Sequence, residues 1–361
     1  MASNRRDGMS YAPSGPVRPV VGPGDFVFAA AHLDHGHIYG QCNGLVEAGA
    51  ELRWVFDPDP DKVDAFVARY PGTRVARALD EILDDPDVRL LAAAAVPSER
   101  CDLGIRVLEA GKDYFTDKAP LTTFEQLARA REAVARTGGK YLAYYSERIH
   151  TESGVRAGEL IAGGAIGRVV QVLGLGPHRL NAASRPAWFF DKARYGGILL
   201  DLGSHQTEQF LHYTGARDAE VLSARSANLG HPDLPGIDDF GEASLRADNG
   251  ASGYFRVDWF TPDGLPTWGD GRTLVLGTDG YIEMRKYIDL ARHDDGDHLY
   301  LVDHDGVRHH ALAGQVGYPF FGQLVLDCLE RSENAMTQAH AFRAVELCLR
   351  AQDLAAGHDP A

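Results

Sequence analysis

The chain lacks a hydrophobic run long enough to cross a membrane. Its longest apolar stretch covers residues 90–96, whereas a membrane helix needs roughly 20 apolar residues. Arg5 and Arg6 lie near the start of the chain, but no apolar segment follows them, so they do not form an export signal. We therefore expect residues 1–24 to be a disordered tail and the protein to be cytoplasmic.

Cysteine is scarce, and the chain has no excess of basic residues. The four cysteines contain no C-x-x-C pair, which argues against a disulfide framework or a zinc ribbon. Lys and Arg number 36 against 51 Asp and Glu, giving a formal net charge of −15. A strongly acidic protein repels a phosphate backbone, so nucleic acid is not an expected partner. No basic amphipathic segment indicates a membrane partner either.

The first half of the chain alternates short apolar runs with helix-like segments. This alternation predicts βαβ units and a parallel sheet. Runs that are apolar throughout, such as residues 90–96, fit strands covered by helices on both faces. The predicted strands cover residues 26–31, 51–56, 88–96, 114–116 and 141–145, and the predicted helices cover 38–48, 60–69, 100–110, 123–137 and 151–162.

After about residue 150 the pattern changes to longer, partly alternating strands. Such strands favour an antiparallel or mixed sheet, and a chain of 361 residues suits two domains. We predict a first domain over residues 25–148 and a second over 149–361. Strands are expected at 169–175, 219–229, 239–247, 252–259, 272–277, 281–285 and 298–303, and helices at 201–213, 323–331 and 337–356.

A dinucleotide-binding (Rossmann) unit normally carries G-x-G-x-x-G after its first strand. Residues 30–37 instead read AAHLDHGH, and only Gly36 matches. Leu33 cannot let a pyrophosphate approach as closely as glycine does. The loop must therefore take another path, in which His35 and His37 donate to phosphate. A metal bound by histidines of this loop is the alternative, but their spacing is unlike a helical His pair, and we expect no metal site.

The acidic residue of the same signature is present. Asp57 follows the predicted strand 51–56 and lies 21 residues after Gly36. A carboxylate there accepts both ribose hydroxyls and repels a 2′-phosphate, which favours NAD over NADP. The alternative is that Asp57 only opens the turn Asp57-Pro58-Asp59-Pro60.

Three stretches, in this order, carry a resemblance to a known family. Residues 108–119 (LEAGKDYFTDKA) resemble L-E-A-G-K-x-V-x-x-E-K-P, residues 164–169 (GAIGRV) resemble G-x-I-G-x-V, and residues 196–205 (GGILLDLGSH) resemble G-G-x-L-x-D-x-G-x-H. These are segments of the Gfo/Idh/MocA family, named after glucose–fructose oxidoreductase and inositol dehydrogenase. The chain resembles a divergent member of that family, since it lacks the glycines and has Ala119 in place of proline.

The resemblance implies both a fold and an activity. The fold class is α/β, with an N-terminal doubly wound parallel Rossmann sheet and a C-terminal α+β domain with a large, open, mostly antiparallel sheet. The implied activity is an NAD(P)-dependent reaction on a sugar, polyol or glycoside, in a homodimer or homotetramer. Two alternatives stay open: a cofactor recycled in place, giving isomerisation or elimination, and a cofactor-binding sensor without catalysis.

The resemblance also implies site residues. The catalytic lysine falls on Lys118, and the D-x-x-x-H pair falls on Asp201 and His205. The turn after the fourth strand, which contacts the cofactor, falls on Val96, Pro97 and Ser98. Lys118 is expected to contact the cofactor as well.

The chemistry of these residue types fits alcohol oxidation, which removes a hydroxyl proton as the hydride leaves. His205 suits the base, because the ordinary pKa of histidine lies near neutral pH. Lys118 stabilises the developing negative charge on oxygen, and Asp201 orients the substrate or tunes His205. Asp201 and His205, four residues apart, are expected on one face of a helix, and His205 and Lys118 are expected to meet. Taken singly, each residue also fits an ordinary structural role: Lys118 as a solvated lysine, His205 as a structural histidine and Asp201 as a helix cap.

Four further residues of the second domain are candidates for substrate binding. His178 and Arg179 follow a predicted strand, and Trp188 and Tyr195 precede the predicted histidine helix. An indole such as that of Trp188 can stack on a sugar face. With Asp201, these residues complete the expected substrate set.

Overall fold

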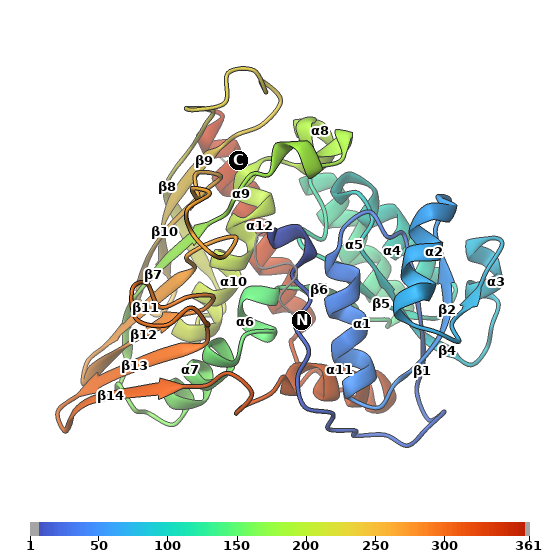
Figure 1. Cartoon of the computed structure of the whole chain (residues 1–361), viewed down its shortest axis with the longest axis horizontal. Coiled ribbons are helices and arrows are strands. Elements are labelled where there is room, and N and C mark those ends of the chain that lie inside the picture. Colours follow the sequence, from blue (N-terminus) through green and yellow to red (C-terminus); the bar gives the residue numbers. More distant parts are fainter. Residues whose placement is uncertain (1–6, 358–361) are drawn as a thin grey trace. The chain divides into compact units, whose positions relative to one another are not determined.

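The computed structural model describes residues 7–357, which divide into two compact units. The N-terminal unit comprises Met9–Tyr144 and Tyr318–Phe342, and the C-terminal unit comprises residues 7–8, Tyr145–Gly317 and 343–357. Each unit is described by itself (Figure 1). The chain divides at 144/145, close to the predicted 148/149, and residues 318–342, which the sequence pattern placed in the second domain, group with the N-terminal unit.

The N-terminal unit is built on a six-stranded parallel sheet of order β3-β2-β1-β4-β5-β6. This confirms the predicted parallel sheet. Residues of β1, β5 and β6 are buried throughout, as strands covered on both faces require. The strands are β1 (Val27–Ala31), β2 (Glu51–Phe56), β3 (Arg74–Val75), β4 (Val88–Ala93), β5 (Asp113–Asp117) and β6 (Tyr141–Tyr144).

Helices of this unit begin and end where local chemistry dictates. The side chain of Asp59 accepts from the amide of Asp61 at the start of one helix, and Thr123 accepts from Gln126 at another. Gly138 ends the latter in the left-handed region. The helices are α1 (His37–Glu47), α2 (Pro60–Arg69), α3 (Leu79–Leu83), α4 (Arg100–Glu109), α5 (Phe124–Thr137) and α11 (Pro319–Glu330), with 3-10 turns η1 (Gly8–Ser10) and η2 (Pro97–Glu99); α12 (Gln338–Ala355) begins in this unit.

Helix α11 joins the N-terminal unit because its aromatic residues bury against that sheet. The ring of Phe320 lies 5.9 Å from that of Phe115, and the ring of Phe321 lies 6.3 Å from that of Tyr144. Arg331 donates to Asp113 at 2.7 Å. Contacts between residues some 200 positions apart in the chain leave no local signal in the sequence.

The segment before β1 lies along α1, in contrast to the expected disordered tail. The amides of Arg18 and Val20 donate to the carbonyls of Glu47 and Ala48, both at 2.9 Å. The side chain of Asn43 donates to the carbonyl of Pro13 at 3.0 Å. Residues 9–20 thus satisfy polar groups at the end and side of a helix; residues 1–6 lie outside the described part of the chain.

The C-terminal unit is built on an eight-stranded sheet of order β14-β13-β12-β11-β7-β10-β9-β8. All neighbouring pairs are antiparallel except β7 and β10, which confirms the mostly antiparallel sheet. The strands are β7 (Val169–Pro177), β8 (Ala219–Ala227), β9 (Phe240–Ala247), β10 (Ser252–Asp258), β11 (Arg272–Gly277), β12 (Gly280–Arg285), β13 (His298–Asp303) and β14 (Gly306–Ala311).

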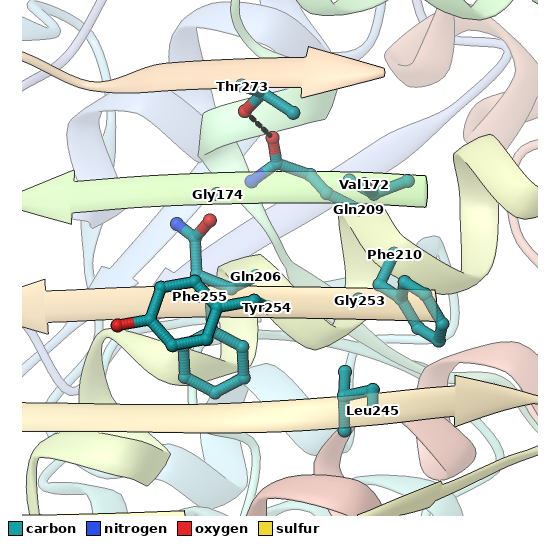
Figure 2. Close-up of a pocket in the computed structure, with 10 residues that line it drawn as sticks. All are labelled: Val172, Gly174, Gln206, Gln209, Phe210, Leu245, Gly253, Tyr254, Phe255 and Thr273. Atoms are coloured by element: carbon teal, nitrogen blue, oxygen red, sulfur yellow. Dashed lines mark hydrogen bonds between the residues drawn. The ribbon is translucent and has the colours of Figure 1, made fainter. Parts of the chain in front are cut away.

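Helices cover one face of this sheet. They are α6 (Ser146–Ile149), α7 (Glu152–Ala162), α8 (Lys192–Tyr195), α9 (Ile198–Asp201) and α10 (Gly203–Thr214), with 3-10 turns η3 (Ala182–Ser184) and η4 (Ala187–Phe190). Helix α10 packs on β7 and β10. Figure 2 shows Gln206, Gln209 and Phe210 of α10 lying over these strands. Gly253 of β10 makes room for this contact, because a Cβ there would lie 2.7 Å from the ring of Phe210.

The predicted helix 201–213 is wrong at its start. Asp201 is the last residue of α9, and α10 begins at Gly203, with Leu202 between them. Asp201 and His205 therefore belong to successive helices. Among residues 7–357, no helix combines the length and apolar character that a bilayer crossing demands.

Candidate functional site

The strand order of the N-terminal unit marks a ligand-binding edge. The order reverses between the neighbours β1 and β4, and open α/β sheets bind ligands beyond the carboxyl ends of strands at such a point. The sequence-predicted cofactor residues follow these two strands and their outer neighbours: His35 to His37 follow β1, Val96 to Ser98 follow β4, Asp57 follows β2, and Lys118 follows β5.

Asp57 ties the end of β2 to the loop after β1. Its Oδ2 accepts from the amide of Leu33 at 2.6 Å, and its Oδ1 accepts from the amide of Asp59 at 2.8 Å. The carboxylate is buried, and Lys62 Nζ lies 3.8 Å from Oδ1. Asp57 therefore opens the turn that follows β2, which is the structural role considered above as the alternative to cofactor binding. A carboxylate has about four acceptor positions, so it retains capacity for ribose hydroxyls.

Gly36 immediately precedes α1, and the structure gives a local reason for its lack of a side chain. A Cβ on Gly36 would collide with the backbone carbonyl of Met9. The start of α1 and the segment around Met9 thus lie in contact. This contact explains the glycine, and the predicted approach of a phosphate to Gly36 stays a prediction.

Behind the start of α1 lies a buried triad of His35, His37 and Asp117. The Nδ1 atom of His37 lies 2.8 Å from Asp117 Oδ1, and the Nδ1 atom of His35 lies 3.4 Å from Asp117 Oδ2. One ligand atom from each residue falls within 4.8 Å of the others, so the triad has the composition of a metal site. Burial first, and then His37, hold the pKa of His35 well below its usual value. His35 is thus a neutral donor or ligand, not a cation for phosphate.

Asp117 organises the end of β5. Burial alone would raise its pKa, but His37, Arg100 and His35 together hold the pKa well below the ordinary value. Its Oδ1 also accepts from the amide of Lys118 at 2.8 Å, and Oδ2 accepts from Arg100 at 3.2 Å. The carboxylate therefore has three donors, while Nδ1 of His35 accepts from the amide of His37 at 3.1 Å; these bonds fix the two imidazole rings without an added ion.

Lys118 is buried, and its backbone is held by Arg100. The guanidinium of Arg100 donates to the carbonyls of Lys118, Ala119 and Ala95, joining the ends of β4 and β5. The Lys118–Ala119 peptide bond is cis. Of the β4 turn, Val96 and Pro97 are buried, and the carbonyl of half-buried Ser98 accepts from Gln126 at 2.8 Å.

His205 lies in the first turn of α10 in the C-terminal unit, with 2% of its surface exposed. Its ring meets that of Tyr145 edge-on at 6.5 Å, and its carbonyl accepts from the side chain of Gln209. Asp201, at the end of α9, is also buried, and its carbonyl accepts from the hydroxyl of Ser204. His205 and Lys118 belong to different units, so their predicted meeting stays a prediction.

A buried polar network lies beside His205. Lys286 Nζ donates to Glu147 Oε2 at 3.0 Å and to Gln209 Oε1 at 2.7 Å, and Gln206 donates to the same Glu147 oxygen at 3.0 Å. Gln209 Oε1 also accepts from Thr273, the bond drawn in Figure 2. Burial alone would raise the pKa of Glu147, but Lys286, His205 and His178 lower it to about 2. The carboxylate is thus a fixed negative charge facing the histidines.

The predicted substrate residues all lie in the C-terminal unit and are all buried. The Nε2 atom of His178 lies 4.0 Å from Glu147 Oε1, which places His178 at the network. Arg179 instead donates to the carbonyls of Pro262 and Leu265 and so holds the following loop.

Trp188 and Tyr195 are also embedded in packing. Trp188 is 8% exposed, and its ring contacts that of Phe189. Tyr195 stacks on Phe189, and its hydroxyl accepts from the amide of Asp238 at 2.9 Å. Both side chains pack inside the C-terminal unit and expose little surface to a ligand.

Sequence reasoning missed several residues of these two clusters. Asp117 stands where the family segment E-K-P has glutamate, and that match was the available signal. Glu147 follows the predicted strand 141–145 and lies in none of the three family segments, so no motif indicated it. Gln206 and Gln209 share the helix of His205, a visible clue, whereas Lys286 left no signal in the local sequence.

Comparison with known proteins follows the same division of the chain. A profile of the GFO/IDH/MocA oxidoreductase family, described as an NAD-binding Rossmann fold, matches residues 20–145. A second profile, the C-terminal domain of the same family, matches residues 155–283.

Individual proteins are also similar. A crystal structure of a proposed oxidoreductase from Erwinia carotovora atroseptica is 49% identical, with a TM-score of 0.89, covering 92% of this chain and 99% of that one. The Bacillus subtilis scyllo-inositol 2-dehydrogenase (NAD(+)) is 26% identical over 71% of each chain. The Escherichia coli oxidoreductase YhhX is 32% identical over 45% of this chain, and the match spans only 46% of YhhX, about half its length.

Proposed function

Because the chain belongs to the Gfo/Idh/MocA oxidoreductase family, we propose that it is an NAD(P)-dependent dehydrogenase or reductase. The substrate is a sugar, polyol or glycoside, and the reaction takes place at a secondary alcohol or ketone carbon of it. Two family profiles cover its two halves, and the similar Bacillus subtilis protein is named as an inositol dehydrogenase. The observation that carries the proposal is the buried His205 beside the charged Glu147–Lys286 pair.

The N-terminal unit would hold the dinucleotide. Asp57 supplies the acceptor for ribose hydroxyls, which favours NAD over NADP. The turn Val96-Pro97-Ser98 follows β4, and Lys118 follows β5. His35, Gly36 and His37, which follow β1, would lie toward the pyrophosphate. The residues present fit a dinucleotide. The buried carboxylate of Asp57 has spare acceptor positions, and helix α1 begins behind it. When bound, the nicotinamide supplies hydride transfer.

Side chains of this protein would carry out the transfer of the substrate's hydroxyl proton. His205 removes the hydroxyl proton of an alcohol, or returns it to a ketone, while Lys118 donates a hydrogen bond to the same oxygen. Asp201 orients the substrate through a hydroxyl. Glu147 fixes the charge around His205 and acts as a positioning residue. Acid–base help of this kind is worth about 10²–10⁴-fold in rate.

The deciding experiment combines cofactor binding with turnover. Sugars, inositols and glycosides are screened with NAD and NADP by nicotinamide absorbance, and dinucleotide affinity is measured by calorimetry. His205→Asn and Lys118→Met should lower kcat by about 10²–10⁴-fold with dinucleotide affinity changed far less for His205→Asn. His212→Asn, at the other end of α10, is the matched control and should keep full activity.

Two outcomes would defeat the proposal. If the wild-type protein binds neither dinucleotide, the family activity does not apply to it. If His205→Asn retains full turnover on an active substrate, His205 has no part in the chemistry. A silent screen with firmly bound nucleotide would instead favour recycling of the cofactor in place.

We also propose a homo-oligomer formed through the helix-free face of the C-terminal sheet. Leu276 of β11 and Tyr281 of β12 are cross-strand partners, and 38% and 37% of their surfaces are exposed. A second copy of the sheet would cover these side chains. Light scattering after gel filtration should give a dimer or tetramer mass, and Leu276→Glu should reduce it; a monomer mass for the wild type would contradict this.

A further inference from the structure

A second histidine cluster lies at the edge of the C-terminal sheet, apart from the residues discussed above. Asp289 and His293 lie in the connection between β12 and β13, His298 begins β13, and His309 lies on the edge strand β14. One ligand atom each from Asp289, His293 and His298 falls within 4.8 Å of the others. The Nδ1 atom of His298 also lies 2.9 Å from Nε2 of His309.

The geometry points to a transition-metal site of the zinc type, with Asp289, His293, His298 and His309 as ligands. Three imidazole nitrogens and one carboxylate oxygen form a donor set that suits Zn²⁺ and its neighbours, and not Mg²⁺ or Ca²⁺. The proposal does not depend on the proposed oxidoreductase function, because none of these four residues belongs to that site.

Asp289, His293 and His298 already hold their ligand atoms within 4.8 Å of one another, and the exposed side chain of His309, next to His298, has to turn to join them. Bonds of roughly 2.0–2.1 Å in a tetrahedral site place ligand atoms about 3.3 Å apart. Asp289 and His298 are buried and fixed, whereas the side chain of His293 is exposed and can adjust. The amide of His293 donates to the carbonyl of Asp289 at 2.9 Å, and the amide of Asp289 donates back at 3.2 Å. The backbone thus holds these two ligands beside each other.

Outer partners support two of the ligands, as metal sites require. The hydroxyl of Tyr300 donates to Asp289 Oδ2 at 2.5 Å, which fixes that carboxylate. Asp295 Oδ1 lies 3.5 Å from Nε2 of His298. If Nδ1 of His298 binds the ion, Nε2 carries the proton and faces Asp295. This is the carboxylate–histidine arrangement that raises the basicity of a metal-bound imidazole.

The alternative occupant of this cluster is a proton shared between His298 and His309. Their nitrogens are close enough for an N–H···N bond, and their rings lie 5.1 Å apart at 22°. A metal binds the neutral form of each imidazole, so a bound ion and a shared proton exclude each other. With zinc bound, the β12–β13 connection would be joined to the edge strand β14.

The test measures zinc binding to the whole protein. After EDTA treatment and dialysis, calorimetry with ZnCl₂ should give one tight site per chain, and MgCl₂ should give none. His309→Ala and His293→Ala remove exposed ligands without disturbing the core, and each should weaken zinc binding at least tenfold. His304→Ala, an exposed histidine of the β13–β14 turn, is the matched control and should bind as the wild type does.

The buried triad of the N-terminal unit is tested in the same series with His35→Ala. Loss of the site in His309→Ala and His293→Ala, with His304→Ala and His35→Ala unchanged, supports the proposal. Absence of saturable binding in the wild type overturns it in favour of the shared proton. Loss only in His35→Ala, or equal loss in His304→Ala, also overturns it, because the zinc then binds elsewhere.

Discussion

The ammonium of Lys286 lies 3.0 Å from Oε2 of Glu147, with both side chains buried in the C-terminal unit. Lys286→Met should destabilise the protein by about 3–5 kcal/mol, because it leaves the Glu147 carboxylate buried without its main counter-charge. The measurement is the free energy of unfolding in denaturant at pH 7. Arg136→Met, which breaks an exposed ion pair with Glu109, is the control and should cost less than about 1 kcal/mol.

The Glu147–Lys286 pair also determines part of how the stability of the fold changes at acid pH. The pKa of Glu147 is about 2 in the fold against an ordinary 4.5, so its stabilising contribution is complete above pH 4.5 and is lost as the pH falls toward 2. In Lys286→Met the folded-state pKa of Glu147 rises toward or above 4.5, so the variant should lose less stability than the wild type as the pH falls from 4.5 to 2. Identical acid unfolding curves for the two proteins would show that the pair does not hold the carboxylate charged.

Asp117 should contribute strongly to stability because it is the buried counter-charge of Arg100. Asp117→Asn keeps the shape of the side chain but leaves Arg100, 1% exposed, without its carboxylate. We expect a loss of about 3–5 kcal/mol. The pKa of Asp117 is held below its ordinary value of 3.8, so this stabilisation is present above pH 3.8 and is lost at lower pH. Thermal unfolding of Asp102→Asn, an exposed carboxylate paired with Arg129, gives the comparison.

Elements with strong local signals were predicted well from the sequence. The predicted ranges 51–56 and 60–69 coincide with β2 and α2. The reason is local: Pro60 opens the helix, and Asp59 caps it. Edge strand β14 was missed, because its residues GVRHHA lack the apolar alternation of a half-buried strand. The break at Leu202 was missed because helical periodicity continues through it.

The candidate site was predictable only where one motif carries it. Asp57 follows a strand, and Lys118 and His205 lie in motif segments, so sequence reasoning named all three. The pairs His37–Asp117 and Glu147–Lys286 are separated by 80 and 139 residues. Nothing in residue spacing reports a contact across such distances, because the folded sheet and not the chain creates it.

Asp57 should decide the choice between the two dinucleotides. Asp57→Asn retains an acceptor for the amide of Leu33 but removes the negative charge. A hydrogen bond to a charged group is worth about 1.5–3 kcal/mol, so the ratio of NAD to NADP affinity should fall roughly 10–100-fold. Calorimetry with both nucleotides measures this ratio.

The matched control for Asp57 is Asp59→Asn, two residues further in the same turn. Asparagine caps a helix as well as aspartate does, so α2 should be unaffected and the nucleotide ratio unchanged. A wild-type protein that already prefers NADP, or an Asp57→Asn variant with the wild-type ratio, would contradict the assignment.

Asp297 should make the protein less stable as the pH rises, the opposite of Glu147 and Asp117. Its Oδ1 accepts from the amide and hydroxyl of Ser153, both at 2.8 Å. Burial, with a smaller contribution from Glu152, raises its pKa from 3.8 to about 6. The protonated form is therefore favoured in the fold, and this contribution is complete below pH 3.8 and is lost as the pH rises through 6.

Replacing this carboxyl by an amide should remove that pH dependence. Asp297→Asn keeps the Oδ1 acceptor for Ser153, and asparagine tolerates the positive φ of 58° at this position. Since the side chain is only half-buried by surface area, we expect the variant to gain about 1–2 kcal/mol over the wild type between pH 4 and pH 7. Denaturant unfolding at both pH values, with the exposed turn residue Asp305→Asn as control, measures the gain. Parallel stability curves for wild type and Asp297→Asn would mean that Asp297 ionises in the fold as readily as in the unfolded chain.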